Sequence, residues 1–280
     1  MIAHTTCREL EFAGDPCALF EELTDRRPDT ALLESADGDG KNNTQSLLFV
    51  QSALRVTARG RQVTLTPLTP GGERALEALL PHLERTTATA RREGALVLTV
   101  PPRPRGGTDR ERLQAPTTAD VLRLLARGWE RRGDTSQPLH LPGVFAYDFV
   151  EQLETLPPAR DAGLPFPDFL FYLPEHVVRV DHPSGRAHLL IHRWLPGEAD
   201  LAEAVPAEAP ARRLREIVER HASLPPRPLD LGANEAAALP DVDVTDAEFA
   251  DLVHRLKEHI LAGDVFQIVP SRTFSTPCTD

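Results

Sequence analysis

Residues 245–274 read TDAEFADLVHRLKEHILAGDVFQIVPSRTF, and this stretch decides more of the fold than any other. Thr245 and Glu248 have the spacing of a helix capping box, in which the side chain of each residue satisfies a free backbone N–H of the other. Gly263 suits the left-handed residue that ends a helix. Between these signals the apolar residues recur at helical spacing: Phe249, Leu252, Val253, Leu256 and Ile260. The pattern predicts an amphipathic helix.

An apolar strand is expected directly after this helix. Over residues 265–269, Val265, Gln267 and Val269 would point to one face of the strand and the other two residues to the opposite face. A helix and a strand of this kind need a domain to pack against, and only six residues follow Phe274. We therefore expect the 280 residues to be the front part of a larger protein.

The rest of the chain predicts an α+β fold, with mixed or antiparallel sheets and flanking helices. Two β-hairpins are indicated, one formed by residues 46–58 and 62–68 and the other by residues 169–180 and 187–194. Further segments are assigned by hydrophobic period and turn signals. Helices are expected over 15–23, 72–83, 117–130 and about 199–222, strands over 30–35, 95–100 and 144–150, and a basic loop over 101–116.

The domain organisation follows from residues 223–241, SLPPRPLDLGANEAAALPD, which are punctuated by proline and show neither the helix nor the strand period. We interpret them as a linker. Residues 1–222 then form an N-terminal domain, and residues 242–280 form the start of a second one.

Composition excludes several classes of protein. The formal net charge of −11 argues against nucleic acid as the main partner, because phosphate binding needs a basic face. The N-terminal residues lack the pattern of a signal peptide, and no run of 18 apolar residues predicts a membrane span. The three cysteines, Cys7, Cys17 and Cys278, form neither a disulfide framework nor a zinc pattern, so a reducing cytoplasm is the expected location.

No catalytic motif stands out from residue spacing alone: the sequence has no GxSxG, no P-loop and no dinucleotide fingerprint. His188 and His192 would lie on one face of a strand and could share a metal ion, but the wet face of a hairpin explains them more simply. We expect no metal site on these residues.

Two places in the sequence can be interpreted as either structural or functional. Glu34 and Ser35 come at the end of a predicted strand, where a carboxylate and a hydroxyl can bind a small ligand that carries an ammonium group, or can simply be solvated. Gln267 is a polar residue between two valines of an apolar strand. Its amide must be hydrogen-bonded if buried, either to the backbone or in a ligand pocket.

A family resemblance rests on these same segments. GDVFQIVPSRTFS, residues 263–275, resembles the segment that opens the chorismate-binding domain of anthranilate synthase component I, and LLESAD, residues 32–37, looks like the tryptophan-binding signature of that family. Further segments fit the family in order: SLLFVQSALR at 46–55, GVFAYD at 143–148, LP at 156–157, PDFLFY at 167–172 and VDH at 180–182.

The resemblance implies a magnesium-dependent lyase. Such an enzyme adds ammonia to chorismate and eliminates pyruvate to give anthranilate, in the first committed step toward tryptophan. The ammonia would come from a glutamine amidotransferase subunit, component II. L-Tryptophan would inhibit by binding the N-terminal regulatory domain, residues 1–222, where Glu34 and Ser35 match the tryptophan pocket.

The resemblance also gives Gln267 a candidate role in the chorismate site. The water-adding relatives, the isochorismate and salicylate synthases, are similar in this strand but carry a lysine as general base. A glutamine amide cannot take up a proton near neutral pH, so Gln267 favours the branch that uses ammonia. The magnesium ligands of the family lie beyond Asp280, so no metal ligand is assigned here, and we expect the 280 residues alone to be inactive.

Two alternatives remain. The first is aminodeoxychorismate synthase component I, which shares the start of the catalytic domain but has no need for the LLES run. The second is a non-catalytic tryptophan-binding module.

Overall fold

The computed structural model describes residues 1–34, 44–84, 87–102, 108–154, 166–201, 208–224 and 240–276. The chain divides into two compact units, Met1–Arg227 and Pro228–Asp280. Most of the predicted linker, residues 223–241, lies outside the described residues. In the part of the chain that the structure describes, no helix is both long enough and apolar enough to cross a membrane.

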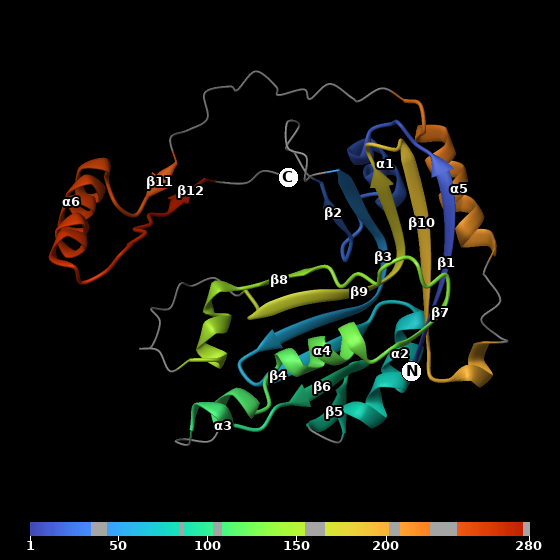
Figure 1. Ribbon diagram of the computed structural model, residues 1–280, viewed down its shortest axis with the longest axis horizontal. Helices are drawn as coiled ribbons and strands as arrows, with labels where there is room; N and C mark the ends of the chain where they lie inside the picture. Colours follow the sequence, from blue (N-terminus) through green and yellow to red (C-terminus); the bar gives the residue numbers. More distant parts are fainter. Residues whose placement is uncertain are drawn as a thin grey trace. The chain divides into compact units, whose positions relative to one another are not determined.

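The larger unit is built on one curled, mixed sheet with helices packed against it (Figure 1). Among the described residues ten strands form this sheet. Eight of them follow the order β5-β6-β4-β3-β9-β10-β1-β7, while β2 pairs with β3 and β8 pairs with β9. The strands are β1 (Ile2–Glu11), β2 (Ala31–Leu33), β3 (Gln45–Arg59), β4 (Gln62–Pro67), β5 (Ala88–Arg92), β6 (Ala95–Thr99), β7 (Glu130–Gly133), β8 (Gly143–Phe145), β9 (Phe169–Asp181) and β10 (Arg186–Leu195).

Both predicted hairpins are confirmed. β3 and β4 pair antiparallel up to Arg59↔Gln62, and β9 and β10 pair antiparallel up to Asp181↔Arg186. Gly60 and Gly185 have positive φ angles of 54° and 63° in the two turns, a conformation that favours glycine. The long strands β3 and β9 also pair with each other, from Gln45↔Asp181 to Ala58↔Phe169, with register shifts around residues 49–54. This pair forms the centre of the sheet.

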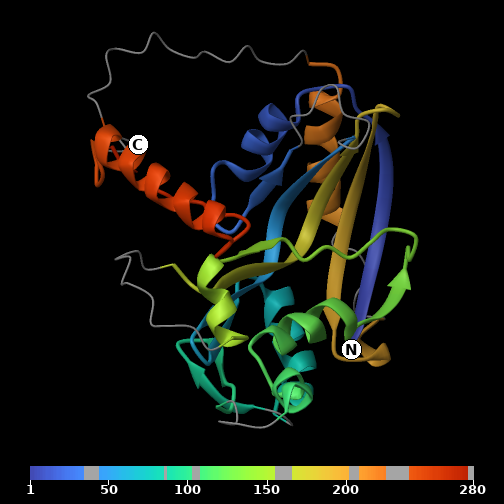
Figure 2. The same cartoon turned by 60° about the vertical axis from the view of Figure 1, so that its left-hand side comes forward.

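Helices cover the sheet in two groups (Figures 1 and 2). Helix α1 (Pro16–Thr24) packs against α5 (Glu208–His221) and β3. Helix α2 (Pro70–Leu83) packs against β10, β3 and β4. The remaining helical segments are α3 (Asp109–Gln114), α4 (Ala119–Arg127) and the 3-10 turns η1 (Tyr147–Gln152) and η2 (Glu198–Leu201). Helices α1 and α2 each begin with a favoured N-cap residue. The Asp15 carboxylate accepts the Cys17 N–H at 2.8 Å, and the Thr69 hydroxyl accepts the Gly72 N–H at 3.0 Å.

Two buried clusters form most of the core, one under each group of helices. The cluster under α1 and α5 contains Phe12, Leu19, Leu48, Val178 and Val218. The cluster under α2 and α4 contains Leu54, Leu65, Leu76, Leu122 and Trp194. β3 and β9 contribute residues to both clusters, because each of these strands is long enough to run beneath both groups of helices.

The smaller unit contains α6 (Asp246–Ala262) and a two-stranded pairing of β11 (Asp241–Val242) with β12 (Phe274–Ser275). The predicted capping box is present: Thr245 Oγ1 accepts the Glu248 N–H, and the Glu248 carboxylate accepts the Thr245 N–H. Gly263 ends the helix with φ at 80°. The helix and both of its end signals are confirmed.

The predicted strand over residues 265–269 is wrong. The structure has no strand there, and Phe266 and Val269 are exposed, the latter to 78%. A strand is stabilised by hydrogen bonds to a neighbouring strand, and within the described residues of the smaller unit nothing pairs with this segment. The sequence has the apolar alternation of a strand, but without a partner the segment does not form one.

Three other segments differ from the prediction. The strand predicted over 144–150 ends at Phe145, and the chain turns into η1, where Phe149 N–H donates to the Ala146 carbonyl at 3.1 Å. The basic loop predicted over 101–116 contains the short helix α3.

The sequence does not predict β1, yet this strand pairs along its whole length with β10 and over its first four residues with β7. Its sequence, IAHTTCRELE, mixes polar and apolar residues, and its place between two strands decides its conformation.

Candidate functional site

The end of β2 presents the Glu34 carboxylate at the protein surface. β2 is held by three residue pairs with β3, from Ala31↔Phe49 to Leu33↔Leu47. Glu34 follows immediately and is exposed, and Leu33 beside it is 52% exposed. Ser35, the other residue predicted at this site, lies outside the described residues. The structure therefore places one of the two predicted groups, at the strand end where the sequence located it.

Glu34 contacts the first turn of helix α1. The thiol of Cys17 donates to Oε2 of Glu34, with an Sγ–Oε2 distance of 2.9 Å. Cys17 itself is fixed because its backbone N–H is bound by the N-cap, Asp15. The hydrogen bond to Glu34, with partial burial and the nearby acidic groups, raises the pKa of Cys17 to about 12. The thiol is therefore protonated at neutral pH and acts as a donor to the carboxylate.

The contact with Cys17 leaves most of the hydrogen-bonding capacity of the Glu34 carboxylate unused. A carboxylate has two oxygens and about four acceptor positions, and the thiol takes one of them. The remaining positions are available to a ligand cation, and no ion pair to Glu34 is present among the described residues. An exposed carboxylate held by a neutral donor suits a ligand that carries an ammonium group.

A second polar pair fixes the neighbouring strand. Ser46 is fully buried, and its Oγ lies 2.8 Å from Nε2 of His182. The backbone N–H of His182 donates to the Thr44 carbonyl at 2.9 Å. These bonds hold the start of β3 against the β9–β10 turn. Neither this pair nor the Cys17–Glu34 contact can be predicted from residue spacing, since each joins residues that are distant in sequence or belong to different elements.

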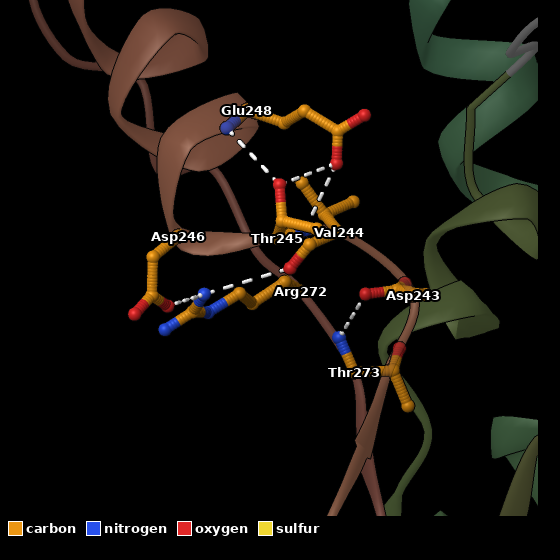
Figure 3. Close-up of polar contacts among 7 residues, drawn as sticks. All are labelled: Asp243, Val244, Thr245, Asp246, Glu248, Arg272 and Thr273. Carbon is orange, nitrogen blue, oxygen red and sulfur yellow. Dashed lines mark hydrogen bonds and ion pairs between the residues drawn. The ribbon is translucent and has the colours of Figure 1, made fainter.

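The predicted chorismate-site residue Gln267 belongs to the smaller unit and is exposed. It lies in the segment that returns from α6 to β12, and a group of contacts around Arg272 fixes the end of that segment (Figure 3). Arg272 pairs with Asp246 in the first turn of α6. Its guanidinium also lies over two rings, 5.2 Å from the centroid of Phe249 and 4.6 Å from that of Phe274.

A further hydrogen bond holds the end of this segment in place. The Thr273 N–H donates to the Asp243 carboxylate at 2.8 Å, next to the pairing of β11 with β12 (Figure 3). The segment that carries Gln267 is therefore anchored at both ends, by the Gly263 cap and by Arg272. Glu34 and Gln267 belong to different units.

No metal site is formed by the described residues. No group of three or more histidine, cysteine, aspartate or glutamate side chains in this part of the chain could hold an ion. These residues therefore do not fit a magnesium site, and no chemical step through magnesium is assigned to them.

The interpretation of His188 and His192 as residues on a wet face is wrong for His192. His192 is 1% exposed, and its Nδ1 lies 2.9 Å from Oγ1 of Thr5. Burial lowers its pKa to about 3, so it is neutral. His188 is largely covered, with Nδ1 near the Cys7 thiol at 3.9 Å.

Comparison with known proteins gives a consistent result. The family model for chorismate binding enzymes matches residues 106–280, and the match begins within the larger unit. The chain is 34% identical over 274 residues to anthranilate synthase component 1 of Vibrio cholerae, which covers 96% of this chain and 50% of that protein. It is 35% identical over 271 residues to the same component of Serratia marcescens, again with 96% and 50% covered.

The corresponding Escherichia coli protein, also named anthranilate synthase component 1, is 34% identical over 273 residues, with 98% of this chain and 51% of that protein covered. The chain thus spans about half the length of the curated relatives that it matches.

Proposed function

The chain belongs to the family of chorismate binding enzymes, and from this we propose that it serves the synthesis of anthranilate from chorismate as part of an anthranilate synthase component I. The reaction would add ammonia to chorismate and eliminate pyruvate, as the first step of tryptophan biosynthesis in the cytoplasm. The observation that carries the proposal is the similarity to proteins named anthranilate synthase component 1 along 96% of the chain.

Within this proposal, residues 1–222 form the regulatory domain and bind L-tryptophan. The exposed Glu34 carboxylate, held on one side by the Cys17 thiol, would accept the ammonium group of the amino acid. Ser35 would add a hydroxyl to the same site. A hydrogen bond between a carboxylate and an ammonium group is charge-assisted and stronger than a neutral one, which suits the recognition of a free amino acid.

Gln267 is proposed to contact the chorismate site. An amide can donate and accept hydrogen bonds but cannot take up a proton near neutral pH. Ammonia is a nucleophile without prior deprotonation, so an amide at this position is compatible with its use. The ammonia would be supplied by a glutamine amidotransferase subunit, and the number in the relatives' name, component 1, is consistent with a partner component.

The rival assignment is aminodeoxychorismate synthase component I. The relatives reported above carry the name anthranilate synthase component 1, which favours anthranilate as the product. The exposed carboxylate at the end of β2 also favours a chain with an amino-acid site. A tryptophan-binding module without catalysis is a second alternative, and it shares the Glu34 site with the main proposal.

The tryptophan site is tested by calorimetry on the 280-residue chain. We expect L-tryptophan to bind with a micromolar Kd and Glu34→Gln to weaken binding by about 10- to 100-fold, the effect of losing one charged hydrogen bond. Indole-3-propionate lacks the ammonium group, so its affinity should not change in Glu34→Gln. The control variant is Glu21→Gln, which removes an exposed carboxylate from α1 outside the contact with Cys17. Equal tryptophan affinity in Glu34→Gln and the parent chain would disprove the assignment.

Turnover is tested separately. With chorismate, ammonia and magnesium, we expect the 280-residue chain to release no anthranilate, because Gln267 is exposed and no metal-binding cluster is formed by the described residues. Anthranilate fluorescence is the measurement. Steady production by the purified chain would show that this half of the relatives' length is sufficient for catalysis.

A further inference from the structure

Strands β9 and β10 separate halfway along their length. Their pairing runs from Arg186↔Asp181 to Ile191↔His176 and then stops. Beyond this point residues 169–174 of β9 stay paired with β3, whereas residues 192–195 of β10 pair with β1. The indole N–H of Trp194 donates to the Pro174 carbonyl at 3.0 Å across the gap. Figure 1 shows the two strands side by side near α1 and apart further along, where α2 lies beside β10.

A cavity of about 350 Å³ opens at this separation. Its polar lining comes from four elements and includes Gln51, Arg74, Glu175, His176 and Arg193. A second cavity of about 590 Å³ adjoins it beneath α1 and α5, and the two share Gln51 and His176. We call the first of these the seam cavity. Glu34 does not line it, so it is separate from the proposed tryptophan site.

The seam cavity has more positive than negative charge. Arg74 and Arg193 line it, and neither forms an ion pair within 4.0 Å with a carboxylate in the described part of the chain. Burial lowers the pKa of Arg193, and the neighbouring Arg74 lowers it further. Glu175 is the one carboxyl group of the lining that acts on them, so positive charge remains in excess, and an anion between the two guanidinium groups would offset it. This concentration of arginine occurs in a chain whose net charge is −11.

The one carboxyl group in the lining is held in place by other residues. Gln51 Nε2 donates to Glu175 Oε2 at 3.2 Å, and a hydrogen bond from Thr69 also reaches this carboxyl. Glu175 packs so closely on Gly71 that a Cβ there would lie 1.8 Å from Oε1. Burial raises the pKa of Glu175, whereas the hydrogen bonds from Thr69 and Gln51 and the charges of Arg74 and Arg193 act to lower it. One carboxyl group facing two guanidinium groups leaves positive charge in the lining that is available to a ligand anion.

Two histidines line the seam cavity, His176 and His192, and both are neutral near pH 7. Burial, together with the charges of Arg193 and Arg27, lowers the pKa of His176 to about 4. Arg27 lies in the adjoining cavity, where its guanidinium donates to the last carbonyls of α1 at Leu23 and Thr24. A neutral imidazole offers one donor and one acceptor. The seam cavity thus combines two cations with uncharged hydrogen-bonding groups.

We propose that the seam cavity binds a small organic anion through Arg74 and Arg193, with Gln51 and His176 as neutral hydrogen-bond partners. The ligand is an oxyanion, either a carboxylate or a phosphate ester, because the planar guanidinium fork matches both. The volume of about 350 Å³ suits a metabolite of modest size.

The test is calorimetry on the 280-residue chain in a chloride buffer of low ionic strength, with citrate and inorganic phosphate as separate probes. We expect saturable binding of at least one probe, and the probe that binds identifies the carboxylate or the phosphate class. Arg74→Gln and Arg193→Gln should each weaken binding at least about tenfold, the typical effect of losing one charged contact. The matched control is Arg26→Gln, an arginine that is 86% exposed and paired with Glu21.

Weaker binding in the arginine variants could also come from a damaged fold. A variant that is expected to bind more tightly distinguishes the two explanations. Glu175→Gln removes the one negative charge of the lining, so it should tighten anion binding by about two- to tenfold. A damaged fold cannot produce tighter binding. Absence of saturable binding by both probes at 10 mM concentration (roughly the weakest affinity of interest) would overturn the proposal. So would equal binding in the parent chain and Arg193→Gln.

Discussion

The Cys17 thiol lies 2.9 Å from the Glu34 carboxylate, and this contact makes the cysteine a poor nucleophile. The thiolate is the reactive form, and the pKa of about 12 leaves very little of it at pH 8.5. Glu34→Gln removes the charged acceptor, which should lower the pKa and speed alkylation of Cys17 by about tenfold or more. The rate is measured by mass spectrometry of the Cys17 peptide after iodoacetamide treatment.

The control for this measurement is Glu21→Gln, since Glu21 contributes least among the acidic groups that act on Cys17. It should change the alkylation rate little. Fast alkylation of Cys17 in the parent chain would show that the hydrogen bond is absent in solution.

The capping box of α6 is expected to stabilise the first turn of that helix. Thr245→Ala removes the acceptor for the Glu248 N–H and should destabilise the helix start by about 1 kcal/mol. Amide hydrogen exchange in residues 246–250 of the full chain should then become about fivefold faster. Thr245→Ser keeps the hydroxyl and serves as the control. Unchanged protection in Thr245→Ala would contradict the role of the cap.

Arg272 is expected to be irreplaceable by lysine. Its planar guanidinium pairs with Asp246 and lies over both Phe249 and Phe274, whereas an ammonium group is a point charge. Arg272→Lys should therefore loosen the pairing of β11 with β12, seen as faster amide exchange at residues 241–242 and 274–275. The same change at Arg255 on α6 should have no effect. Equal protection in both variants would show that charge alone is sufficient.

Acid should destabilise the larger unit through its buried histidines. The folded-state pKa of His176 is lowered to about 4, below its ordinary value of 6.5, so the unfolded chain binds more protons between these values. Stability is therefore retained above pH 6.5 and is lost as the pH falls toward 4. Between pH 7.5 and pH 5 the loss from this residue is about 2 kcal/mol.

The measurement is urea unfolding of the parent chain and of His176→Gln at both pH values. The variant should lose about 2 kcal/mol less than the parent over this interval. His82→Gln is a suitable control, since His82 lies in the last turn of α2, away from the seam cavity. An identical pH dependence for all three chains would contradict the burial of His176.

The parts of the fold that could be predicted from sequence are those with local causes. The hairpin turns around Gly60 and Gly185 and the capping box at Thr245 depend on residues within a few positions of each other. The strand predicted over 265–269 failed because strand formation depends on a pairing partner, which the pattern of one segment does not reveal. β1 was missed for the same reason, since its two neighbours in the sheet determine it.

The candidate sites divide in the same way. Glu34 could be placed from sequence because it follows a short apolar strand, but its partner Cys17 lies on a separate helix. The seam cavity had no signal at all in the sequence. Its residues come from distant segments, and only the separation of β9 from β10 brings Gln51, Arg74 and Arg193 together.

The length of β3 and β9 has a consequence for how the larger unit unfolds. Each of the two hydrophobic clusters includes residues from both strands, so neither cluster can be exposed to water without detaching part of the same strand pair. Both halves of this unit therefore depend on the same backbone hydrogen bonds between β3 and β9. Heating should melt them in one cooperative transition, in which the β3–β9 pairing is lost only when both clusters come apart.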